Sequence, residues 1–494
     1  MSNRPNLLIF MTDQERADVV APGHPCQTPN ADRLAREGVR FTQTYCPTAH
    51  CCPARATFMT GLYPSRHGVF NNVRTRTAIN LGLKLGVTTF AEELRTASYD
   101  LTLCGKWHVS AEEDPHDRGW HERAVTAAGS TFHSVSIEQW RQGGRGNDST
   151  RSDNGARPRG HVQRPGWGDF VLYKTLPDGG PKGYEQDNDY RVVQAAMETL
   201  HEYAQRTEPW CLFVGPIGPH DPFNVPEKFV KLYDPEQIPL PASYADPMTD
   251  KPRIYQRHRR QLWDQLSEAE VRESLAHYWA YCTMEDALLG ELLDALDATG
   301  QADNTLVIFL SDHGDYCGDH GLYLKGVPAF RQAYHVPCIM RWPQGIEAPG
   351  REVDAFVSLA DFAPTFLDLA GVESKQRMTG QSLTPFLRNE QPDLWRDAIH
   401  TQMNGVELYY TQRSVTTKEF KYVYNGFDFD ELYDLQQDPA EVINLADHPD
   451  YQATKRDLVR RMWRFAAQEE DIIFNPYGTV GLAPWGPADG LRED

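Results

Sequence analysis

Residues 51–61 read Cys-Cys-Pro-Ala-Arg-Ala-Thr-Phe-Met-Thr-Gly, and this stretch carries the strongest signal for fold and function in the chain. Five separated positions within it form the string C-x-P-x-R-x-x-x-x-T-G. Such a string gains weight when other motifs accompany it in the expected context. Four do: Asp13 after the first apolar run, Gly-Lys-Trp-His at 105–108, His220 and Pro222 after a later apolar run, and Ser-Asp-His-Gly at 311–314.

Short apolar runs alternate with amphipathic stretches on both sides of this string. The run at 6–11 is followed by helix-like patterns at 30–37 and 88–95. This alternation predicts an α/β fold with a large, doubly wound, mainly parallel sheet flanked by helices. Helical spacing at 278–296 precedes a strand at 305–310, so the motif at 311–314 follows the carboxyl end of a strand, where open α/β sheets bind their ligands.

The chain of 494 residues is long enough for two domains. We predict a catalytic α/β domain over residues 1–390 and a smaller α+β domain over residues 391–494. The second contains short β-like segments at 420–424 and 431–435, a helix at about 451–468, and an irregular tail from 476, where Pro and Gly recur.

Two stretches interrupt the alternation, at 110–189 and 245–270, and both are predicted to be long loops. Arginines of the first loop line a route for anions, or they are solvated side chains of an insertion. The arginines concerned are Arg141, Arg145, Arg151, Arg157, Arg159 and Arg164.

Bulk composition excludes several classes of protein. A net charge of −20 argues against nucleic-acid partners and anionic membrane surfaces, so an anionic substrate requires locally gathered positive charge. No apolar run approaches membrane-spanning length. Nine cysteines without regular spacing do not form a disulfide framework and indicate a reducing compartment. The N-terminus looks like a first strand and not a signal peptide, so we expect a cytoplasmic protein.

The motifs, in their order and positions, resemble the formylglycine-dependent sulfatase family of the alkaline phosphatase-like superfamily along nearly the whole chain. The resemblance implies a small C-terminal domain with a four-stranded antiparallel sheet and a packed helix. It also implies that a formylglycine-generating enzyme oxidises Cys51, with Pro53 and Arg55 as recognition residues. The hydrated aldehyde would then be the nucleophile that cleaves a sulfate ester.

Four residues after strand-like runs would, by the same resemblance, bind one divalent cation beside the formylglycine. They are Asp13, Gln14, Asp312 and His313. Many sulfatases have Asp in place of Gln14 and Asn in place of His313. Oxygen ligands favour calcium or magnesium and an imidazole favours a transition ion, so we predict calcium first and manganese next.

The remaining catalytic roles also follow from the resemblance. Lys106 binds the sulfate and the formylglycine, and His108 takes the proton from the hydroxyl whose departure releases sulfate. The two lie two positions apart, so on an extended segment they point the same way. His220 is the predicted general acid, and Lys325 contacts the ester oxygens. Asp315, Asp319 and His320 are predicted to be supporting or turn residues.

Two rival functions remain open at this point. The Gln14 and His313 departures favour a phosphonate monoester or phosphodiester hydrolase of the same superfamily, whereas the intact Gly-Lys-Trp-His string favours sulfate esters. A non-catalytic protein that binds sulfated ligands is the second rival. Substrate identity is not readable beyond a small anionic sulfate ester, and the tail leaves homo-oligomer formation possible.

Overall fold

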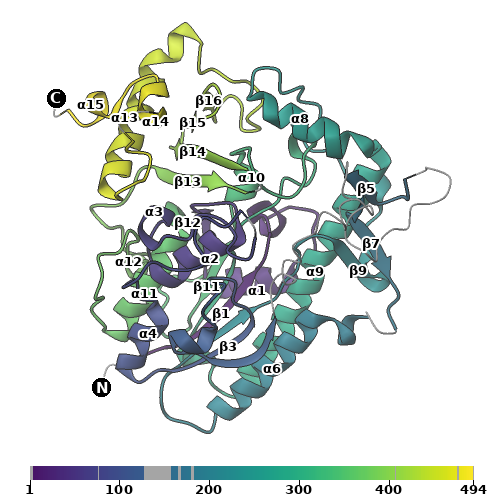
Figure 1. Cartoon of the computed structure of the whole chain (residues 1–494). Coiled ribbons are helices and arrows are strands. Elements are labelled where there is room, and N and C mark those ends of the chain that lie inside the picture. The colour runs from purple at the N-terminus through teal and green to yellow at the C-terminus, as the bar shows by residue number, and fades with distance from the viewer. Residues whose placement is uncertain are drawn as a thin grey trace.

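The computed structural model describes residues 4–75, 77–126, 157–164, 168–179, 183–406, 408–475 and 478–492. Its main sheet has the strand order β12-β2-β11-β10-β1-β8-β3-β4 (Figure 1). The strands are β1 (Asn6–Thr12), β2 (Val39–Tyr45), β3 (Asp100–Lys106), β4 (His121–Thr126), β8 (Trp210–Gly215), β10 (Thr305–Ser311), β11 (Cys338–Arg341) and β12 (Arg351–Ser358). Among these strands only β11 runs antiparallel to its neighbours, which confirms the mainly parallel sheet.

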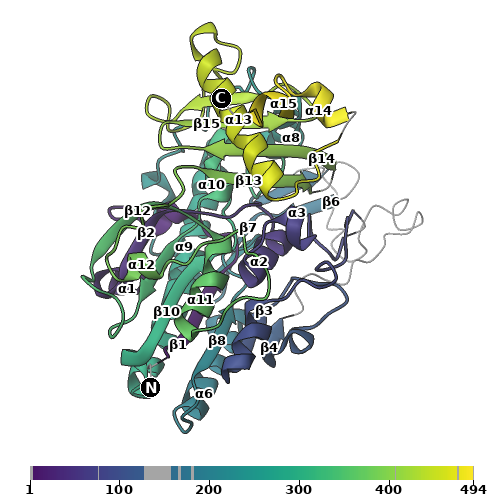
Figure 2. The same ribbon diagram turned by 90° about the vertical axis from the view of Figure 1, so that its left-hand side faces the viewer.

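Helices cover both faces of this sheet. One face carries α1 (Pro29–Glu37), α6 (Asn188–Tyr203) and α9 (Glu268–Ala298), and the other carries α2 (Cys51–Thr60), α4 (Phe90–Leu94) and α11 (Phe362–Ala370) (Figure 2). Strands β1, β8 and β10 are almost entirely apolar and buried, as expected for parallel strands covered on both faces. The predicted doubly wound fold is therefore confirmed.

Short elements complete this part of the chain. The short helices are α3 (Pro64–His67), α7 (Glu227–Val230), α10 (Arg331–Tyr334) and α12 (Thr384–Leu387). Two small sheets lie beside α9: β5 (His161–Arg164) pairs with β6 (Gly168–Val171), and β7 (Tyr173–Leu176) pairs with β9 (Phe223–Pro226).

A separate antiparallel sheet lies above α2 in Figure 1. It consists of β13 (Ile399–Gly405), β14 (Tyr409–Thr416), β15 (Phe420–Asn425) and β16 (Glu431–Asp434), paired in that order. Helix α13 (Gln452–Gln468) packs on it through Leu458 and Trp463, which share a buried cluster with Tyr422 and Leu432. The C-terminal sheet and helix are confirmed, while the domain boundary at residue 390 stays a prediction.

The prediction of a loop at 245–270 was wrong. Helix α8 (Arg253–Leu262) occupies its centre, and Ser267 caps the first turn of α9. The charged side chains of α8 lie mainly toward solvent, and Tyr255 is its buried residue. The Tyr255 hydroxyl donates a hydrogen bond to Glu431 Oε1 at 2.7 Å. One buried residue in ten gives too little apolar periodicity to reveal a helix.

The stretch at 110–189 contains β4 to β7 and so is not one long loop. Arg157 pairs with Glu270 and Arg159 with Glu273, each at 2.6 Å, so both guanidinium groups hold this stretch against α9. The Arg164 guanidinium lies over the Phe170 ring, 4.9 Å from its centroid. These contacts do not support the prediction that Arg157, Arg159 and Arg164 line a route for anions. The other three arginines of that prediction lie outside the described residues; they are Arg141, Arg145 and Arg151.

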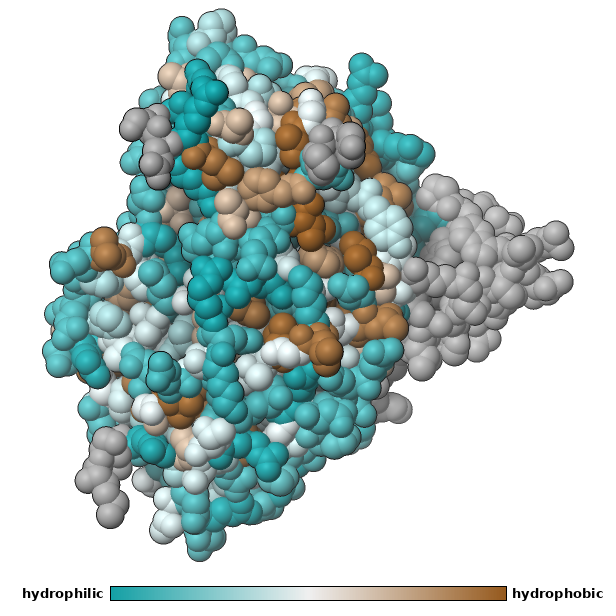
Figure 3. Space-filling model, turned by 60° about the vertical axis from the view of Figure 1, so that its left-hand side comes forward, coloured by the Kyte–Doolittle hydropathy of each residue, from teal (hydrophilic) through white to brown (hydrophobic). Residues whose placement is uncertain are grey.

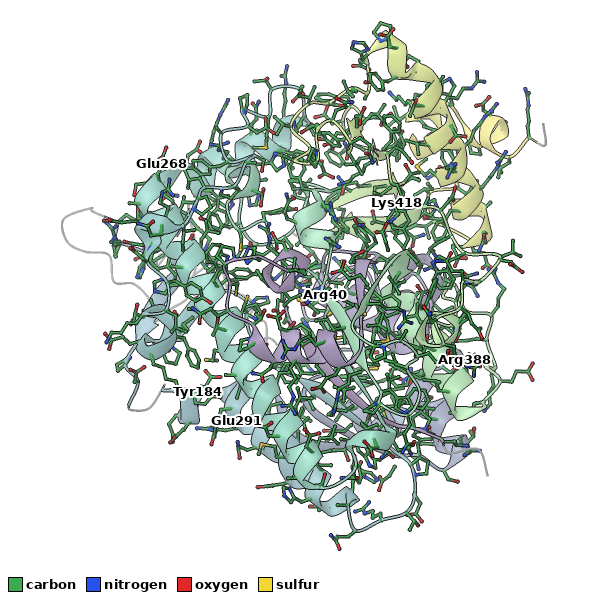
Figure 4. The ribbon with its side chains drawn as sticks, turned by 180° about the vertical axis from the view of Figure 1, so that it is seen from behind. Arg40, Tyr184, Glu268, Glu291, Arg388 and Lys418 are labelled. Carbon is green, nitrogen blue, oxygen red and sulfur yellow. The ribbon has the colours of Figure 1, made fainter. Side chains whose placement is uncertain are left out.

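Hydrogen bonds to α9 continue further along this stretch. The Tyr184 hydroxyl donates to Glu291 Oε1 at 2.7 Å, which ties the turn Tyr184–Gln186 to the helix (Figure 4).

The C-terminal tail is more regular than predicted. It forms two short helices, α14 (Gly478–Leu482) and α15 (Pro487–Gly490). The Trp463 indole N–H donates to the Trp485 carbonyl oxygen at 2.8 Å, so the tail folds back onto α13.

The surface is mainly hydrophilic, with apolar side chains scattered among polar ones on the face shown in Figure 3. Within the part of the chain that the structure describes, no helix combines the length and apolar character needed to span a membrane. All nine cysteines are buried and free, as predicted for a chain without a disulfide framework.

Candidate active site

Cys51 begins helix α2 and is 2% exposed. Its Sγ lies 3.2 Å from His313 Nε2 and 3.7 Å from Asp13 Oδ1. The neighbouring Cys52 is turned away, because its Sγ accepts a hydrogen bond from the Val73 backbone N–H and burial raises its pKa. The first residue of a helix also lies in the favourable field of the helix dipole for a group that becomes negatively charged. The structure thus places Cys51, and not Cys52, among the predicted site residues.

Parallel strands bring the other residues to Cys51. The adjacent strands β10, β1, β8 and β3 all end at the same edge of the sheet. Asp13 follows β1, Asp312 and His313 follow β10, Lys106 ends β3, and the segment after β8 leads to His220. Motifs that lie far apart in sequence therefore meet at one edge, as open parallel sheets require.

Four buried side chains form a candidate metal site. One ligand atom from each of Asp13, Cys51, Asp312 and His313 lies within 4.8 Å of all the others. His313 Nδ1 donates to the Gly314 carbonyl oxygen at 2.9 Å, which leaves the Nε2 lone pair directed at the site. Burial lowers the pKa of His313, so the ring is in the neutral form that binds metals. Two carboxylates and a neutral imidazole fit a divalent cation.

Gln14 lies beside these four atoms and is held by charged groups. Its amide N–H₂ donates to Asp315 Oδ2 at 2.5 Å and to Asp221 Oδ1 at 3.2 Å. Its amide oxygen accepts a hydrogen bond from Lys325 Nζ. The hydrogen bonds of the amide N–H₂ group therefore fix the orientation of the Gln14 amide oxygen, which is the atom that would bind a cation. The role of Gln14 as a metal ligand stays a prediction.

Two cations balance the carboxylates. Arg55 Nε donates to Asp312 Oδ2 at 2.7 Å, and Lys106 Nζ donates to Asp13 Oδ2. Burial opposes the ionisation of Asp13, but Lys106 and other cations outweigh it and hold its pKa well below the ordinary value. Arg55 also donates to the Lys106 carbonyl oxygen at 2.9 Å, so the two cations are positioned together.

His108 lies in the same environment, though not for the predicted reason. Strand β3 ends at Lys106, and His108 has a φ of 54°, so residues 106–108 do not form one extended segment. A turn in the backbone, and not strand alternation, brings the two side chains to the same region. Burial, then Lys106 and Arg55, lower the pKa of His108 well below its ordinary value, so the ring is neutral. A neutral imidazole can accept a proton, which is the role predicted for it.

His220 and Lys325 form a contact pair. His220 Nε2 lies 2.7 Å from Lys325 Nζ, and His220 Nδ1 lies 2.7 Å from the Asp221 carbonyl oxygen. Burial and Lys325 lower the pKa of His220, but Asp221 and Asp13 raise it more, so the net pKa lies above the ordinary value. The Lys325 side chain is only 10% exposed, so its long loop does not carry it into solvent.

Sequence reasoning missed three polar residues of this region, Asp221, Asn72 and His50, whereas Asp315 was predicted to be a supporting or turn residue and supports Gln14. Asp221 and Asp315 orient Gln14, and Asn72 Oδ1 accepts a hydrogen bond from the Cys52 backbone N–H at 3.1 Å. His50 precedes Cys51 and is 4% exposed. The adjacency of Asp221 to His220, and of His50 to Cys51, was a usable signal, whereas Asn72 had none.

Asp319 and His320 lie outside this cluster. Asp319 pairs with Arg16 at 2.8 Å. His320 Nδ1 lies 2.8 Å from Asp246 Oδ2, and its ring stacks on Phe330 with a centroid distance of 3.5 Å. These partners agree with a supporting role and give His320 no place among the candidate metal ligands.

Comparison with known proteins establishes the family. The sequence profile described as Sulfatase matches residues 5–372, which is most of the chain. The chain belongs to the sulfatase family. A second profile, described as N-sulphoglucosamine sulphohydrolase, C-terminal, matches residues 318–468. The protein is therefore a sulfatase-family enzyme of the alkaline phosphatase-like superfamily, as the motifs predicted.

Relatives of this sulfatase cover most of its length. It is 31% identical to a choline-sulfatase of Rhizobium meliloti over 91% of this chain and 83% of that protein. It is 28% identical to a multifunctional alkaline phosphatase superfamily protein of Trinickia caryophylli, over 97% and 99% of the two chains. Among solved structures, a phosphonate monoester hydrolase of Agrobacterium radiobacter superimposes with a TM-score of 0.77 at 26% identity, covering 94% of this chain and 96% of that chain.

Proposed function

We propose that this protein hydrolyses a small sulfate ester, with a nucleophile that derives from Cys51 and one divalent cation. The observation that carries the proposal is the position of Cys51. It begins α2 within 4.8 Å of donor atoms from Asp13, Asp312 and His313, and Lys106 donates to that same Asp13. The comparison with sulfatases, including the choline-sulfatase, supports the sulfate ester as the substrate class.

Oxidation of Cys51 to formylglycine by a maturation enzyme provides, after hydration, two hydroxyls on one carbon, one to attack sulfur and one to release sulfate. Asp13, Asp312 and His313, with Gln14 beside them, would hold a divalent cation, which would supply positive charge for the hydroxyl and the ester oxygens. We propose calcium first and manganese second, because one imidazole accompanies the oxygen donors.

The protein's own side chains perform the remaining steps. Lys106 and Arg55 pair with the carboxylates of Asp13 and Asp312 and gather positive charge for the sulfate, against a net charge of −20 for the whole chain. His108, neutral in its buried position, takes the proton that must leave for sulfate release. His220 donates a proton to the leaving oxygen, for which a raised pKa is suited, and Lys325 offsets charge on the same oxygen.

A phosphonate monoester or phosphodiester hydrolase is the second candidate. Gln14 and His313 favour it, and so does the likeness to the phosphonate monoester hydrolase of Agrobacterium radiobacter. The intact Gly-Lys-Trp-His string at 105–108 favours sulfate esters. We also propose a cytoplasmic location, which the nine free and buried cysteines support.

Peptide mass spectrometry and paired substrates test the proposal. We expect a loss of about 18 Da at Cys51, the difference between cysteine and the aldehyde, in protein made with a formylglycine-generating enzyme. An activated aryl sulfate is expected to turn over faster than the matching phenyl phosphonate monoester. Cys51→Ala is expected to abolish both activities and Cys52→Ala to retain them. An unmodified Cys51 would contradict the mechanism, and a preference for the phosphonate would favour the second candidate.

A further inference from the structure

His50 caps the helix that begins with Cys51, yet its side chain does not serve the helix. N-cap residues are usually Ser, Thr, Asp or Asn, whose side chains accept a hydrogen bond from the first turn. The His50 ring makes no such bond, and only its backbone carbonyl acts as a cap, accepting from the Ala54 N–H at 3.1 Å. Helix capping therefore does not explain an imidazole at this position.

The ring is buried without full hydrogen bonding. His50 is 4% exposed, and within the described residues its Nδ1 has no hydrogen-bond partner. Almost all buried polar atoms in folded proteins have a partner, because an unsatisfied one costs free energy. An unpartnered nitrogen beside the proposed nucleophile therefore points to a partner that arrives from outside the chain.

Positive groups surround the ring. Lys325, Lys106 and His220 act electrostatically on it, the neutral ring of His313 lies near them, and all four residues belong to the predicted site. They come from the end of β3 and from the segments after β8 and β10, and they adjoin His50 through its sequence neighbour Cys51, whose Sγ lies 3.2 Å from His313 Nε2. An imidazole N–H that donates a hydrogen bond suits an anion bound among these groups.

We propose that His50 is a substrate-binding residue, whose Nδ1–H donates a hydrogen bond to a non-bridging oxygen of the bound sulfate ester. The inference rests on the proposed function, which makes the anion a sulfate ester. It adds a donor from the N-terminus of α2 to those that Lys106 and Lys325 supply from other segments of the chain.

Two substitutions separate binding from helix capping. His50→Asn is a good N-cap and keeps an N–H donor near the position of Nδ1, whereas His50→Ser is a good N-cap whose shorter side chain does not reach. The control is His277→Asn, which replaces a buried ring on α9 whose two nitrogens already have partners in Thr175 and the Glu273 carbonyl oxygen.

The measurements are kcat/KM for an aryl sulfate, the inhibition or binding constant of inorganic sulfate, Tm, and formylglycine content at Cys51. For His50→Ser we expect weaker sulfate binding and a lower kcat/KM, each by roughly 10- to 100-fold, at unchanged Tm and formylglycine content. His50→Asn is expected to stay within about threefold of the wild type, and His277→Asn to leave kcat/KM unchanged.

Unchanged sulfate binding and kcat/KM in His50→Ser would overturn the inference, and so would a loss that follows Tm or formylglycine content. Failure of the proposed function gives a different pattern, namely wild-type protein that does not hydrolyse aryl sulfates. In that case the sulfate-binding constants of the same variants still decide whether His50 binds the anion.

Discussion

Asp13 shows how single residues set the chemistry of this site. Its carboxylate accepts from Lys106, lies 3.6 Å from an Arg55 nitrogen, and lies 3.5 Å from His313 Nε2. These contacts hold its pKa well below the ordinary value, so Asp13 is ionised across the physiological range and can bind a cation without losing a proton. The preference between calcium and manganese would then depend on His313, which stands where many sulfatases have Asn.

Replacement of His313 tests the choice of metal. His313→Asn exchanges an imidazole for an amide oxygen and so favours calcium over manganese. After chelator treatment, we expect the ratio of manganese-restored to calcium-restored activity to fall roughly tenfold in the variant. The measurement is a titration of each ion against activity and by calorimetry. Equal ratios in both proteins would show that His313 does not bind the cation.

Strands and their polar ends were the most predictable elements. The runs at 6–11 and 305–310 became β1 and β10, and the polar residues after them met at one sheet edge because parallel strands end together. Helix α8 was missed because most of its side chains are polar and only one of them is buried. The supporting role of Asp315 was predicted, but its specific bond to Gln14 was not, and Asp221 was missed, because both carboxylates reach Gln14 only through tertiary packing, for which one sequence has no periodic signal.

Helix α9 carries a buried acid that supports the His220 segment. Within the described residues, neither carboxyl oxygen of Glu285 has a hydrogen-bond partner of suitable geometry. The neighbouring Asp189 accepts hydrogen bonds from the backbone N–H groups of Ile217 and Gly218. The fit is tight, because a Cβ on Gly218 would lie 2.1 Å from Glu285 Oε1. Burial and the neighbouring Asp189 raise the pKa of Glu285 well above 4.5, so we infer a neutral carboxyl group.

Because Gln resembles the protonated carboxyl group in shape, Glu285→Gln is expected to change the free energy of unfolding by no more than about 1 kcal/mol near pH 4.5, and the difference should grow in favour of the variant as pH rises. Above pH 4.5 the folded wild type retains a proton that the unfolded chain has released, so wild-type stability falls as pH rises toward the raised pKa. The variant lacks this proton, and its slope should be shallower by up to about 1.4 kcal/mol per pH unit. Denaturant unfolding between about pH 5 and pH 9 measures both slopes.

Glu291→Gln is the matched control, because Glu291 lies on the same helix but is partly exposed and accepts from the Tyr184 hydroxyl. Its slope should follow that of the wild type. Equal slopes for Glu285→Gln and the wild type would show that Glu285 is ionised in the folded protein.

At the scale of the whole molecule, the C-terminal sheet makes hydrogen bonds to the segments on both sides of α2, the helix that begins with Cys51. The Gln402 N–H of β13 donates to the Pro47 carbonyl oxygen at 2.7 Å, and the Gln402 carbonyl accepts from Thr48 Oγ1 at 2.6 Å. Its side chain accepts from the Ser65 N–H at 3.0 Å and donates to Asp471 at 2.9 Å. One residue of the sheet thus contacts the chain on both sides of α2, so the two proposed domains depend on each other.

Gln402→Ala tests this dependence. It leaves the buried Ser65 N–H without its acceptor, whereas Asp471 Oδ2 keeps its hydrogen bond from Arg413 Nε, so we expect a loss of about 1–3 kcal/mol in the free energy of unfolding. Because Ser65 follows α2 closely, we also expect kcat/KM to fall several-fold at full formylglycine content. Thr401→Val is the control, since among the described residues the Thr401 hydroxyl bonds only Ser414 of the same sheet, at 2.7 Å. It should lower stability and leave kcat/KM unchanged at temperatures where the protein is folded. Equal effects of the two variants on kcat/KM would mean that the sheet stabilises the molecule without positioning α2.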